Sequence, residues 1–455
     1  MIMTRHENNG VTICFIALGC PKNVVDSERM LAEIVQAGYL ITSEPDTADV
    51  VIVNTCGFIE PAKAEAFEAI RQAVAAKKQA SVRKVIVAGC LAQRLGQDIF
   101  DMTSGVDAIV GLGQRDDIVP IIKATLASDH PLEYMDHPCR QAGDYIPDDR
   151  VRLPIISRYW AYLRISEGCD HRCSFCTIPS IRGPFRSKPQ ELVLAEAAEL
   201  VAAGAVELNI IGQDTTYYGR DRNEKNALAK LLQQIEKIDK LRWIRLLYSY
   251  PTWITSRLIN TMAAGDKIVH YIDMPIQHIN DKILKAMRRP DTKKSITRLI
   301  ENLRDAVPDI VLRTTLIVGF PGETDEQFEE LIEFIRWTRF EALGCFTYYP
   351  ESGTPAARMP GQISQEVKQQ RLERLMLTQQ KIAFEKNNSR IGQTLQCLID
   401  SVEHDGTAEG RFYGQAPQID SVCIVDDGIA EPGRFITAEI TGTKDYDLIV
   451  RQLLC

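Results

Sequence analysis

Several features that would place the protein in a familiar class are missing from its sequence. No apolar run approaches the roughly 20 residues needed to cross a membrane, and the longest runs, such as Val11–Leu18, have the length of a strand. The first ten residues are polar and lack a signal-peptide pattern. No Ser/His/Asp arrangement or Gly-Lys-Thr phosphate loop is present. We therefore expect a cytoplasmic protein without membrane association, whose reduced cysteines serve as metal or catalytic groups.

Positive charge is also scarce, above all at the C-terminus. The 455-residue chain has a formal net charge of −8, and residues 390–455 hold five Lys/Arg against eleven Asp/Glu. An acidic segment is a poor match for nucleic-acid phosphates and a good match for a basic partner. A merely solvated surface is the alternative. The length predicts two to four domains, and the 45% hydrophobic content is that of a globular chain.

Short apolar runs alternate with helical patterns over residues 11–126. The runs at Thr12–Leu18, Val50–Val53, Val85–Ala88 and Asp107–Val110 do not alternate with polar residues. Uninterrupted apolar runs of this length are typical of strands buried on both faces. The N-terminal part is therefore predicted to be an α/β domain with a doubly wound parallel sheet.

Three cysteines follow these runs at nearly equal spacing and form what we call the dispersed triplet. Cys20, Cys56 and Cys90 are separated by 36 and 34 residues, close to one strand–helix–strand step each. Ligands bind at the carboxyl ends of strands in such sheets, so we expect the three thiols at one sheet edge as metal ligands. A single cysteine in this position is more often a buried packing residue.

The rest of the chain predicts two further folds. Residues 155–385 repeat a strand-then-helix pattern about six times, which predicts a partial (βα)6 barrel with polar motifs just past its strand ends. Residues 366–388 read as one polar helix. Residues 390–452 show alternation and turns typical of a small antiparallel barrel or sandwich. Residues 127–154 lack periodicity and are interpreted as a linker.

A second group of cysteines, the compact triplet, lies at the start of the predicted barrel. Cys169, Cys173 and Cys176 occur in the stretch Glu-Gly-Cys-Asp-His-Arg-Cys-Ser-Phe-Cys. Three thiolates suit an iron–sulfur cluster that leaves one iron open for chemistry. Structural zinc normally takes four protein ligands, and His171 or Cys139 could supply the fourth. From the residues alone, zinc remains the alternative.

The spacing Cys-x-x-x-Cys-x-x-Cys after a first barrel strand resembles the radical S-adenosylmethionine (SAM) enzymes. The resemblance implies a 4Fe-4S cluster whose open iron chelates SAM and whose electron releases a 5′-deoxyadenosyl radical. It also implies contacts to the methionine amine, the adenosine and the adenine. The residues placed at these contacts are Phe175, Gly212, Gln213, Asp214, Val318 and Gly319. An ordinary turn is the alternative for the last glycine.

The two triplets, the barrel and the small β module together resemble the methylthiotransferase branch of these enzymes over nearly the whole chain. The resemblance implies an N-terminal domain at 1–145, a radical SAM core at 146–386 and an OB-like TRAM domain at 387–455. It implies that the dispersed triplet holds an auxiliary 4Fe-4S cluster with the sulfur to be transferred. One SAM molecule would donate a methyl group and a second would supply the radical.

Two subfamilies of this branch differ in substrate. One modifies isopentenyl-adenosine in transfer RNA, and the other modifies an aspartate β-carbon in ribosomal protein S-twelve. The stretch Leu-Gly-Cys-Pro-Lys-Asn-Val-Val-Asp-Ser-Glu around Cys20 resembles the second. The acidic C-terminal segment independently favours a basic protein over an RNA. We expect ribosomal protein S-twelve as substrate, an electron donor such as flavodoxin or ferredoxin, and a ribosome-associated partner. Transfer RNA methylthiolation and a non-enzymatic zinc or iron–sulfur binding module are the alternatives.

Overall fold

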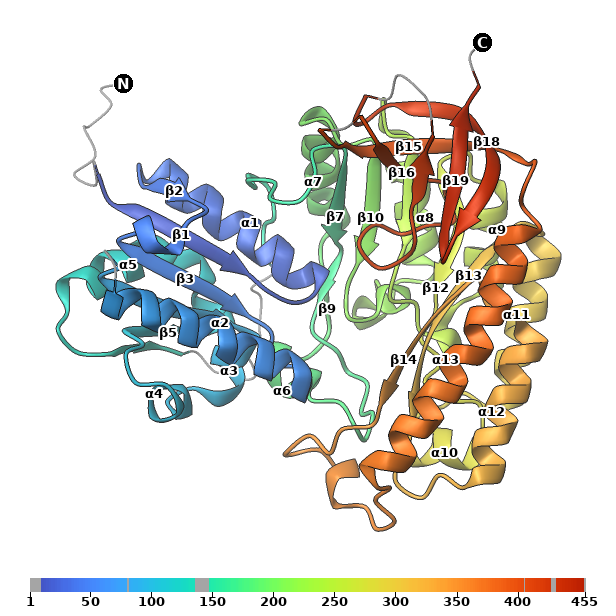
Figure 1. The fold of residues 1–455 in the computed structure, drawn as a ribbon, viewed down its shortest axis with the longest axis horizontal. Helices are drawn as coiled ribbons and strands as arrows, with labels where there is room; N and C mark the ends of the chain where they lie inside the picture. Colours follow the sequence, from blue (N-terminus) through green and yellow to red (C-terminus); the bar gives the residue numbers. More distant parts are fainter. Residues whose placement is uncertain (1–9, 80–81, 136–146, 405, 427–430, 454–455) are drawn as a thin grey trace. The chain divides into compact units, whose positions relative to one another are not determined.

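The computed structural model describes residues 10–79, 82–135, 147–404, 406–426 and 431–453 (Figure 1). The chain divides into two compact units. The N-terminal unit comprises Met1–Ile156, Glu167–His171 and Cys176–Arg186, and the C-terminal unit comprises Ser157–Ser166, Arg172–Phe175 and Ser187–Cys455. Within the described residues, no helix combines the length and apolar character needed to cross a membrane.

The N-terminal unit is built on a six-stranded, fully parallel sheet of order β2-β1-β3-β4-β5-β6. Its strands are β1 (Thr12–Ala17), β2 (Leu40–Thr42), β3 (Val50–Thr55), β4 (Lys84–Gly89), β5 (Ala108–Val110) and β6 (Leu132–Tyr134). The sequence patterns predicted the four inner strands. They missed β2 and β6, which are edge strands of three residues each. The interpretation of residues 127–154 as a plain linker is therefore wrong at β6.

Helices cover both faces of this sheet, so the predicted doubly wound architecture is confirmed. They are α1 (Pro21–Gln36), α2 (Glu60–Gln79), α3 (Cys90–Leu95), α4 (Asp98–Met102) and α5 (Ile118–Ala127). Val51 and Val53 of β3 belong to the same buried cluster as Ile70 of α2. Ile52 points to the opposite face and packs with Ile34 of α1. Alternate residues of one strand thus enter two cores, which explains the uninterrupted apolar runs.

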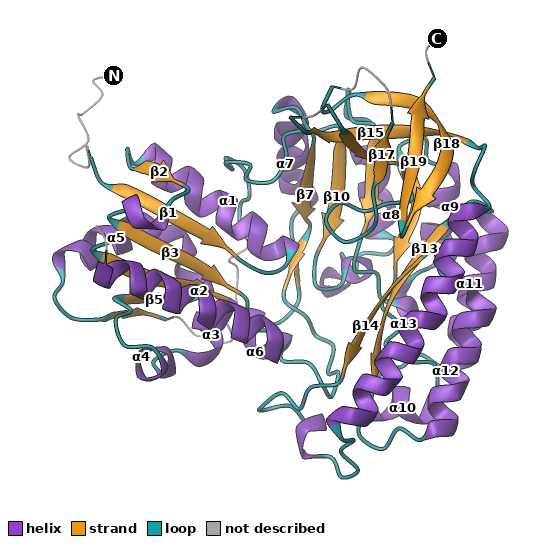
Figure 2. Cartoon of the chain, viewed as in Figure 1, coloured by secondary structure: helices purple, strands orange, loops and turns teal. Residues whose placement is uncertain are grey.

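The C-terminal unit contains the predicted partial barrel. Six parallel strands occur in the order β14-β13-β12-β11-β10-β7. Figure 2 labels β7, β10, β13 and β14 of this sheet. They are β7 (Trp160–Arg164), β10 (Glu207–Ile211), β11 (Trp243–Leu246), β12 (Ile268–Asp273), β13 (Val311–Val318) and β14 (Ala342–Thr347). The short strands β8 (Ser166–Glu167) and β9 (Arg186–Ser187) pair with each other, and α6 (Ile178–Arg182) lies between them in sequence.

Helices follow the barrel strands and bury one face against them. They are α7 (Gln190–Ala202), α8 (Ala227–Ile235), α9 (Ser256–Ala264), α10 (Asp281–Ala286), α11 (Lys293–Ala306), α12 (Asp325–Thr338) and α13 (Gln365–Asn388). The last of these is the polar helix that the sequence predicted at 366–388. Leu231, Ile259 and Ile335 share one apolar cluster with outward-facing strand residues such as Ile244 and Leu316. This is the layered packing expected of a (βα) barrel.

The acidic C-terminal segment forms a closed five-stranded barrel, which confirms the predicted small β module. Its strands are β15 (Thr394–Val402), β16 (Ala408–Arg411), β17 (Cys423–Val425), β18 (Phe435–Lys444) and β19 (Asp447–Gln452). Buried charges join it to the barrel strands. Glu207 of β10 pairs with Arg245 of β11 and Arg411 of β16, each at 2.8 Å. Burial would penalise any of these charges alone, so the pairing fixes how the two folds meet.

Candidate functional site

The dispersed triplet lies at the carboxyl ends of three neighbouring strands. Cys20 follows β1 and is the N-cap of α1, Cys56 follows β3 directly, and Cys90 follows β4 as the first residue of α3. The strand ends are level, because Ala17 pairs in register with Asn54 of β3 and Thr55 pairs with Gly89 of β4. The sheet therefore brings together three cysteines that are far apart in the sequence.

Glycines beside these cysteines allow the loops to approach closely. A methyl group on Gly19 would lie 2.7 Å from Cys56 Cβ. A methyl group on Gly57 would lie 2.7 Å from Leu91 Cα and 2.9 Å from the Cys90 carbonyl oxygen. Real Cβ atoms do not make such contacts, so both positions require glycine. A glycine adjacent to each cysteine was the sequence feature that marked this close approach.

Two polar side chains that the sequence reasoning missed connect the three strand ends. Asn23 Nδ2 donates to the Leu18 carbonyl at 2.9 Å and to the Thr55 carbonyl at 2.8 Å. Arg182 Nη2 lies 3.4 Å from Cys90 Sγ and 3.1 Å from Asn23 Oδ1. Both side chains are buried. Arg182 follows the compact triplet by only a few residues, yet it belongs to the same compact unit as the dispersed triplet.

The Arg182 charge is balanced by buried carboxylates. Its guanidinium pairs with Asp26 and with Glu167, each at 3.1 Å. Asp26 also pairs with Arg115. Because each of these groups has charged partners, the ion pairs offset the free-energy cost of removing the charges from water. The result is a fixed positive group directed at one thiol of the triplet.

The thiols influence one another's pKa values, as expected for groups at one sheet edge. Burial and the Cys20 thiol raise the pKa of Cys56. Burial, helped by Cys20 and Cys56, raises the pKa of Cys90 to about 12 despite the opposing charge of Arg182. Cys20 is the exception, because Lys22 and Arg182 outweigh burial and lower its pKa. A bound metal replaces such protons, since coordinating thiols are deprotonated.

Three thiols at one sheet edge match the three-cysteine ligand set of an iron–sulfur cluster with one open iron. Among the residues that the structure describes, no group of three or more His, Cys, Asp or Glu side chains is found that could hold a metal ion. For the compact triplet, the sequence offered His171 or Cys139 as a fourth zinc ligand. Cys139 lies outside the residues that the structure describes, and so does Cys455.

The compact triplet lies on one loop between β8 and α6. Gly168 starts this loop at a φ of +78°, and a methyl group there would collide with the Pro184 carbonyl. The Cys169 amide donates to the Gly183 carbonyl at 3.1 Å. The Ile178 amide lies 3.5 Å from Cys176 Sγ. Backbone contacts therefore hold the loop at both ends.

Cys173 lies beside an arginine and a tyrosine of the C-terminal unit. Burial raises the pKa of its thiol, while the Arg289 charge and hydrogen bonds from Arg289 and Tyr250 oppose this. Arg289 stacks on the Tyr250 ring at 3.8 Å and donates to the Pro275 carbonyl at 2.8 Å. The sequence placed Tyr250 just past a strand end as a possible residue of the substrate cleft. Arg289 was not predicted, because no motif marks it.

The residues predicted to contact SAM all lie at or just past the carboxyl ends of barrel strands, except Phe175 on the cysteine loop. Gly212 follows β10, and a methyl group there would lie 2.6 Å from Ser166 Oγ. Gln213 is half-buried. Asp214 is buried and accepts from Thr216 Oγ1 at 2.6 Å and from the Tyr217 amide at 3.2 Å. That Gly212, Gln213 and Asp214 contact SAM stays a prediction.

The later strand shows the same placement. Val318 is the buried last residue of β13. Gly319 has a φ of +74°, and its amide donates to Glu323 Oε2 at 2.9 Å. Phe175 packs with the buried ring of Phe320. Gly319 therefore does form a turn, as the alternative interpretation proposed. A glycine in such a turn can still contact a cofactor, so the two interpretations are compatible.

Comparison with known proteins agrees with this arrangement. A family model described as the radical SAM superfamily matches residues 163–335, one described as uncharacterized protein family UPF0004 matches 12–111, and one described as the TRAM domain matches 391–452. The chain is 43% identical to ribosomal protein uS12 methylthiotransferase RimO of Bdellovibrio bacteriovorus, over 98% of each chain. The protein of the same name from Geobacter sulfurreducens is 43% identical, over 96% of this chain and 97% of its own.

The chain belongs to the RimO family of methylthiotransferases. It is therefore a radical SAM methylthiotransferase that uses SAM and 4Fe-4S clusters. A solved structure with a similar fold is that of the radical SAM methyltransferase TsrM from Kitasatospora setae, with a TM-score of 0.55, 13% identity, and coverage of 76% of this chain and 73% of that one. At this identity the likeness concerns the fold alone.

Proposed function

We propose that this RimO family member methylthiolates the β-carbon of an aspartate in ribosomal protein uS12. In the proposal the dispersed triplet holds the auxiliary cluster and the compact triplet holds the radical-generating cluster. When bound, these groups supply the sulfur and, with two SAM molecules, the methyl group and the radical. The observation that carries the proposal is the gathering of Cys20, Cys56 and Cys90 at one sheet edge. A second set of three thiols has no function in a one-cluster radical enzyme.

The chain's own residues have distinct tasks in this proposal. Arg182 and Lys22 place positive charge beside thiolates in a buried site. The predicted contacts Phe175, Gly212, Gln213, Asp214, Val318 and Gly319 position SAM at the strand ends. The buried setting of Cys90 and Cys169 limits access of water and oxygen. Exclusion of competing reactions is the general contribution of the protein in such enzymes.

The surface of the C-terminal barrel supports a basic protein as substrate. Two of its acids, Asp400 and Asp420, are used internally by Arg411 and Arg313. The described part of the same barrel also exposes Glu403, Glu409, Asp426 and Asp445. An acidic surface of this kind attracts basic ribosomal proteins and repels RNA phosphates. The relatives' name specifies uS12, and the charge pattern favours a substrate of that kind.

Further parts of the proposal concern context. We place the enzyme in the cytoplasm, with an electron donor such as flavodoxin or ferredoxin and with ribosome-associated partners. We also assign the three domains to residues 1–145, 146–386 and 387–455. The family matches at 12–111, 163–335 and 391–452 fall within these ranges.

The deciding experiment compares uS12 from cells with and without this gene. Intact-protein and peptide mass spectrometry should show a methylthio mass increment on one aspartate, lost on deletion and restored by the wild-type gene. Transfer RNA nucleosides from the same cells serve as the control and should be unchanged. Unchanged uS12 together with missing methylthio-adenosine would contradict the proposal.

A further inference from the structure

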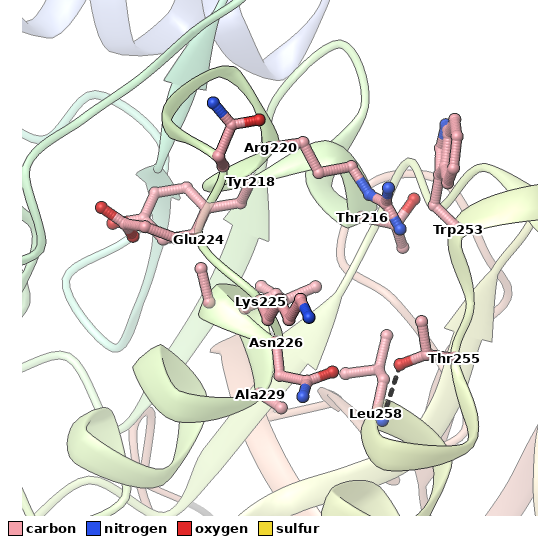
Figure 3. Close-up of a pocket in the computed structure, with 13 residues that line it drawn as sticks. Thr216, Tyr218, Arg220, Glu224, Lys225, Asn226, Ala229, Trp253, Thr255 and Leu258 are labelled. Atoms are coloured by element: carbon pink, nitrogen blue, oxygen red, sulfur yellow. Dashed lines mark hydrogen bonds between the residues drawn. The ribbon is translucent and has the colours of Figure 1, made fainter.

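A cavity of about 420 Å³ opens in the C-terminal unit beside the predicted SAM contacts. It lies between the segment after β10 and the starts of α8 and α9 (Figure 3). Thr216 forms part of its wall and donates to Asp214 at 2.6 Å. The Tyr250 amide donates to Thr216 Oγ1 at 2.9 Å, and the Tyr250 side chain hydrogen-bonds to Cys173. Thr216 and Tyr250 thus connect the cavity wall to a cysteine of the compact triplet.

Arg220 is the dominant polar group of this cavity. Its guanidinium stacks on Trp253 at 3.8 Å from the ring centroid, and Figure 3 shows the side chain reaching across the cavity toward that ring. Within the described part of the chain, no carboxylate pairs with Arg220. Arg222, two residues on, is instead neutralised by Glu224 at 2.9 Å. A stacked guanidinium keeps its N–H edge available for a planar, two-point acceptor.

The surroundings of Arg220 add positive charge and an apolar wall. Lys225 lines the same cavity and is exposed. Asn226, at the start of α8, makes no side-chain cap, so the first-turn amides of that helix add a weaker attraction for anions. Trp253 and Leu258 supply apolar surface. Glu224 also lines the cavity but is paired with Arg222 at 2.9 Å, so Arg220 and Lys225 leave a local positive charge.

We propose that this cavity binds a carboxylate of the protein substrate, with Arg220 as its two-point donor. The inference rests on the proposed function and names a positioning residue for it. A carboxylate matches the planar guanidinium edge, and the volume and apolar wall suit a side chain with its flanking backbone. The carboxylate belongs either to the target aspartate or to an acidic neighbour in the same substrate segment.

The test measures binding directly. Labelled uS12 is titrated into the anaerobically reconstituted holoenzyme with SAM, and the Kd is read from fluorescence anisotropy. Arg220→Gln should weaken binding about tenfold, as expected for loss of one charge-assisted, two-point contact. Arg220→Lys should also weaken it, because an ammonium cannot replace the planar fork. Lys230→Gln, which removes a charge from the exposed side of α8, should retain the wild-type Kd.

A second arm identifies the carboxylate. If it is the target aspartate, changing that aspartate to asparagine in uS12 weakens binding to the wild-type enzyme. The same change then leaves the Kd of the Arg220→Gln enzyme unaltered. If both changes weaken binding independently, the carboxylate is a neighbouring acid, which also supports the proposal. An unchanged Kd for Arg220→Gln, or a loss confined to SAM affinity, would overturn it. Failure of wild-type enzyme to bind uS12 would instead refute the proposed function itself.

Discussion

The two cysteine triplets offer the same three donors through opposite constructions. The compact triplet spans residues 169–176 of one loop, so the chain itself keeps its members close. The dispersed triplet spans residues 20–90, and only the register of three parallel strands brings its members together. The first is a local property of sequence and the second is a property of the fold. The second should therefore be the more sensitive to any change in packing.

The largest predicted effect comes from removing each triplet in turn. Changing the three cysteines of the dispersed triplet to Ala should lower iron from about eight to about four per chain and abolish methylthiolation. Reductive cleavage of SAM by the compact triplet should persist. The converse triple change should abolish both activities. Iron analysis, 5′-deoxyadenosine and methylthiolated uS12 are measured on anaerobically prepared protein. Loss of all iron in both variants would show that the triplets are not separable.

A second prediction tests whether the fold maintains the dispersed triplet. Gly89 ends β4 immediately before Cys90 and has a φ of +95°. A methyl group there would collide with Asn54 Oδ1 and lie 2.7 Å from the Thr55 carbonyl oxygen. Gly89→Ala should therefore cost more than about 2 kcal/mol of unfolding free energy and release about half the iron, from the dispersed triplet alone.

Gly96→Ala is the matched control in the same unit. Its φ of +53° is also positive, but the nearest atom would be Glu133 Oε1 at 3.6 Å. Only the backbone strain of a positive φ, about 1–2 kcal/mol, should appear, with iron retained. Urea unfolding and iron analysis measure both variants. Equal losses in the two would mean that packing around Gly89 has no special role.

The same contrast explains what the sequence predicted well. Strand-length apolar runs, the cysteine spacings and the helix at 366–388 predicted all three folds, because periodicity and burial are local properties. The structure added the edge strands β2 and β6, which are too short to produce a pattern. It also added Asn23 and Arg182, whose contacts depend on long-range packing. The SAM contacts predicted from the sequence lie at strand ends. The hydrogen-bond partners of these residues, however, could be identified only from the structure.

A third prediction sharpens the comparison by using one arginine from each site. Arg182 lies 3.4 Å from Cys90 Sγ, and Arg289 hydrogen-bonds to Cys173. A positive charge beside a ligand sulfur favours the reduced, more negative cluster. Arg182→Gln should lower the midpoint potential of the auxiliary cluster by roughly 60 mV, the one-electron equivalent of a tenfold change. Arg289→Gln should lower that of the radical cluster.

Potentiometric titration followed by electron paramagnetic resonance reports both clusters in one sample. Each single variant provides the control for the other, because the cluster next to the intact arginine should keep its potential. Suppose that either substitution shifts the midpoint potentials of both clusters equally. The arginine charges would then act over the whole protein, and the assignment of one arginine to each triplet would be wrong.

The smallest predicted effect concerns pH and the helix that begins at Cys20. Burial, with Asp116 nearby, raises the pKa of Glu33 in α1 to about 7. A carboxyl whose folded pKa is raised stabilises the fold while protonated, and this contribution is lost as pH rises through about 7. Because Glu33 is only partly buried, the difference should be about 1 kcal/mol or less.

Glu33→Gln should therefore raise the urea midpoint of the N-terminal unit at pH 8 and change it little at pH 5. The exposed Glu65→Gln on α2 should stay within about 0.5 kcal/mol of wild type at both pH values. Iron release at sub-denaturing urea and pH 8 should slow in Glu33→Gln for the dispersed triplet only, since α1 carries Cys20 at its start. Equal slowing at both triplets would show that the compact triplet depends on the same packing, and the contrast between a local and a fold-dependent site would be lost.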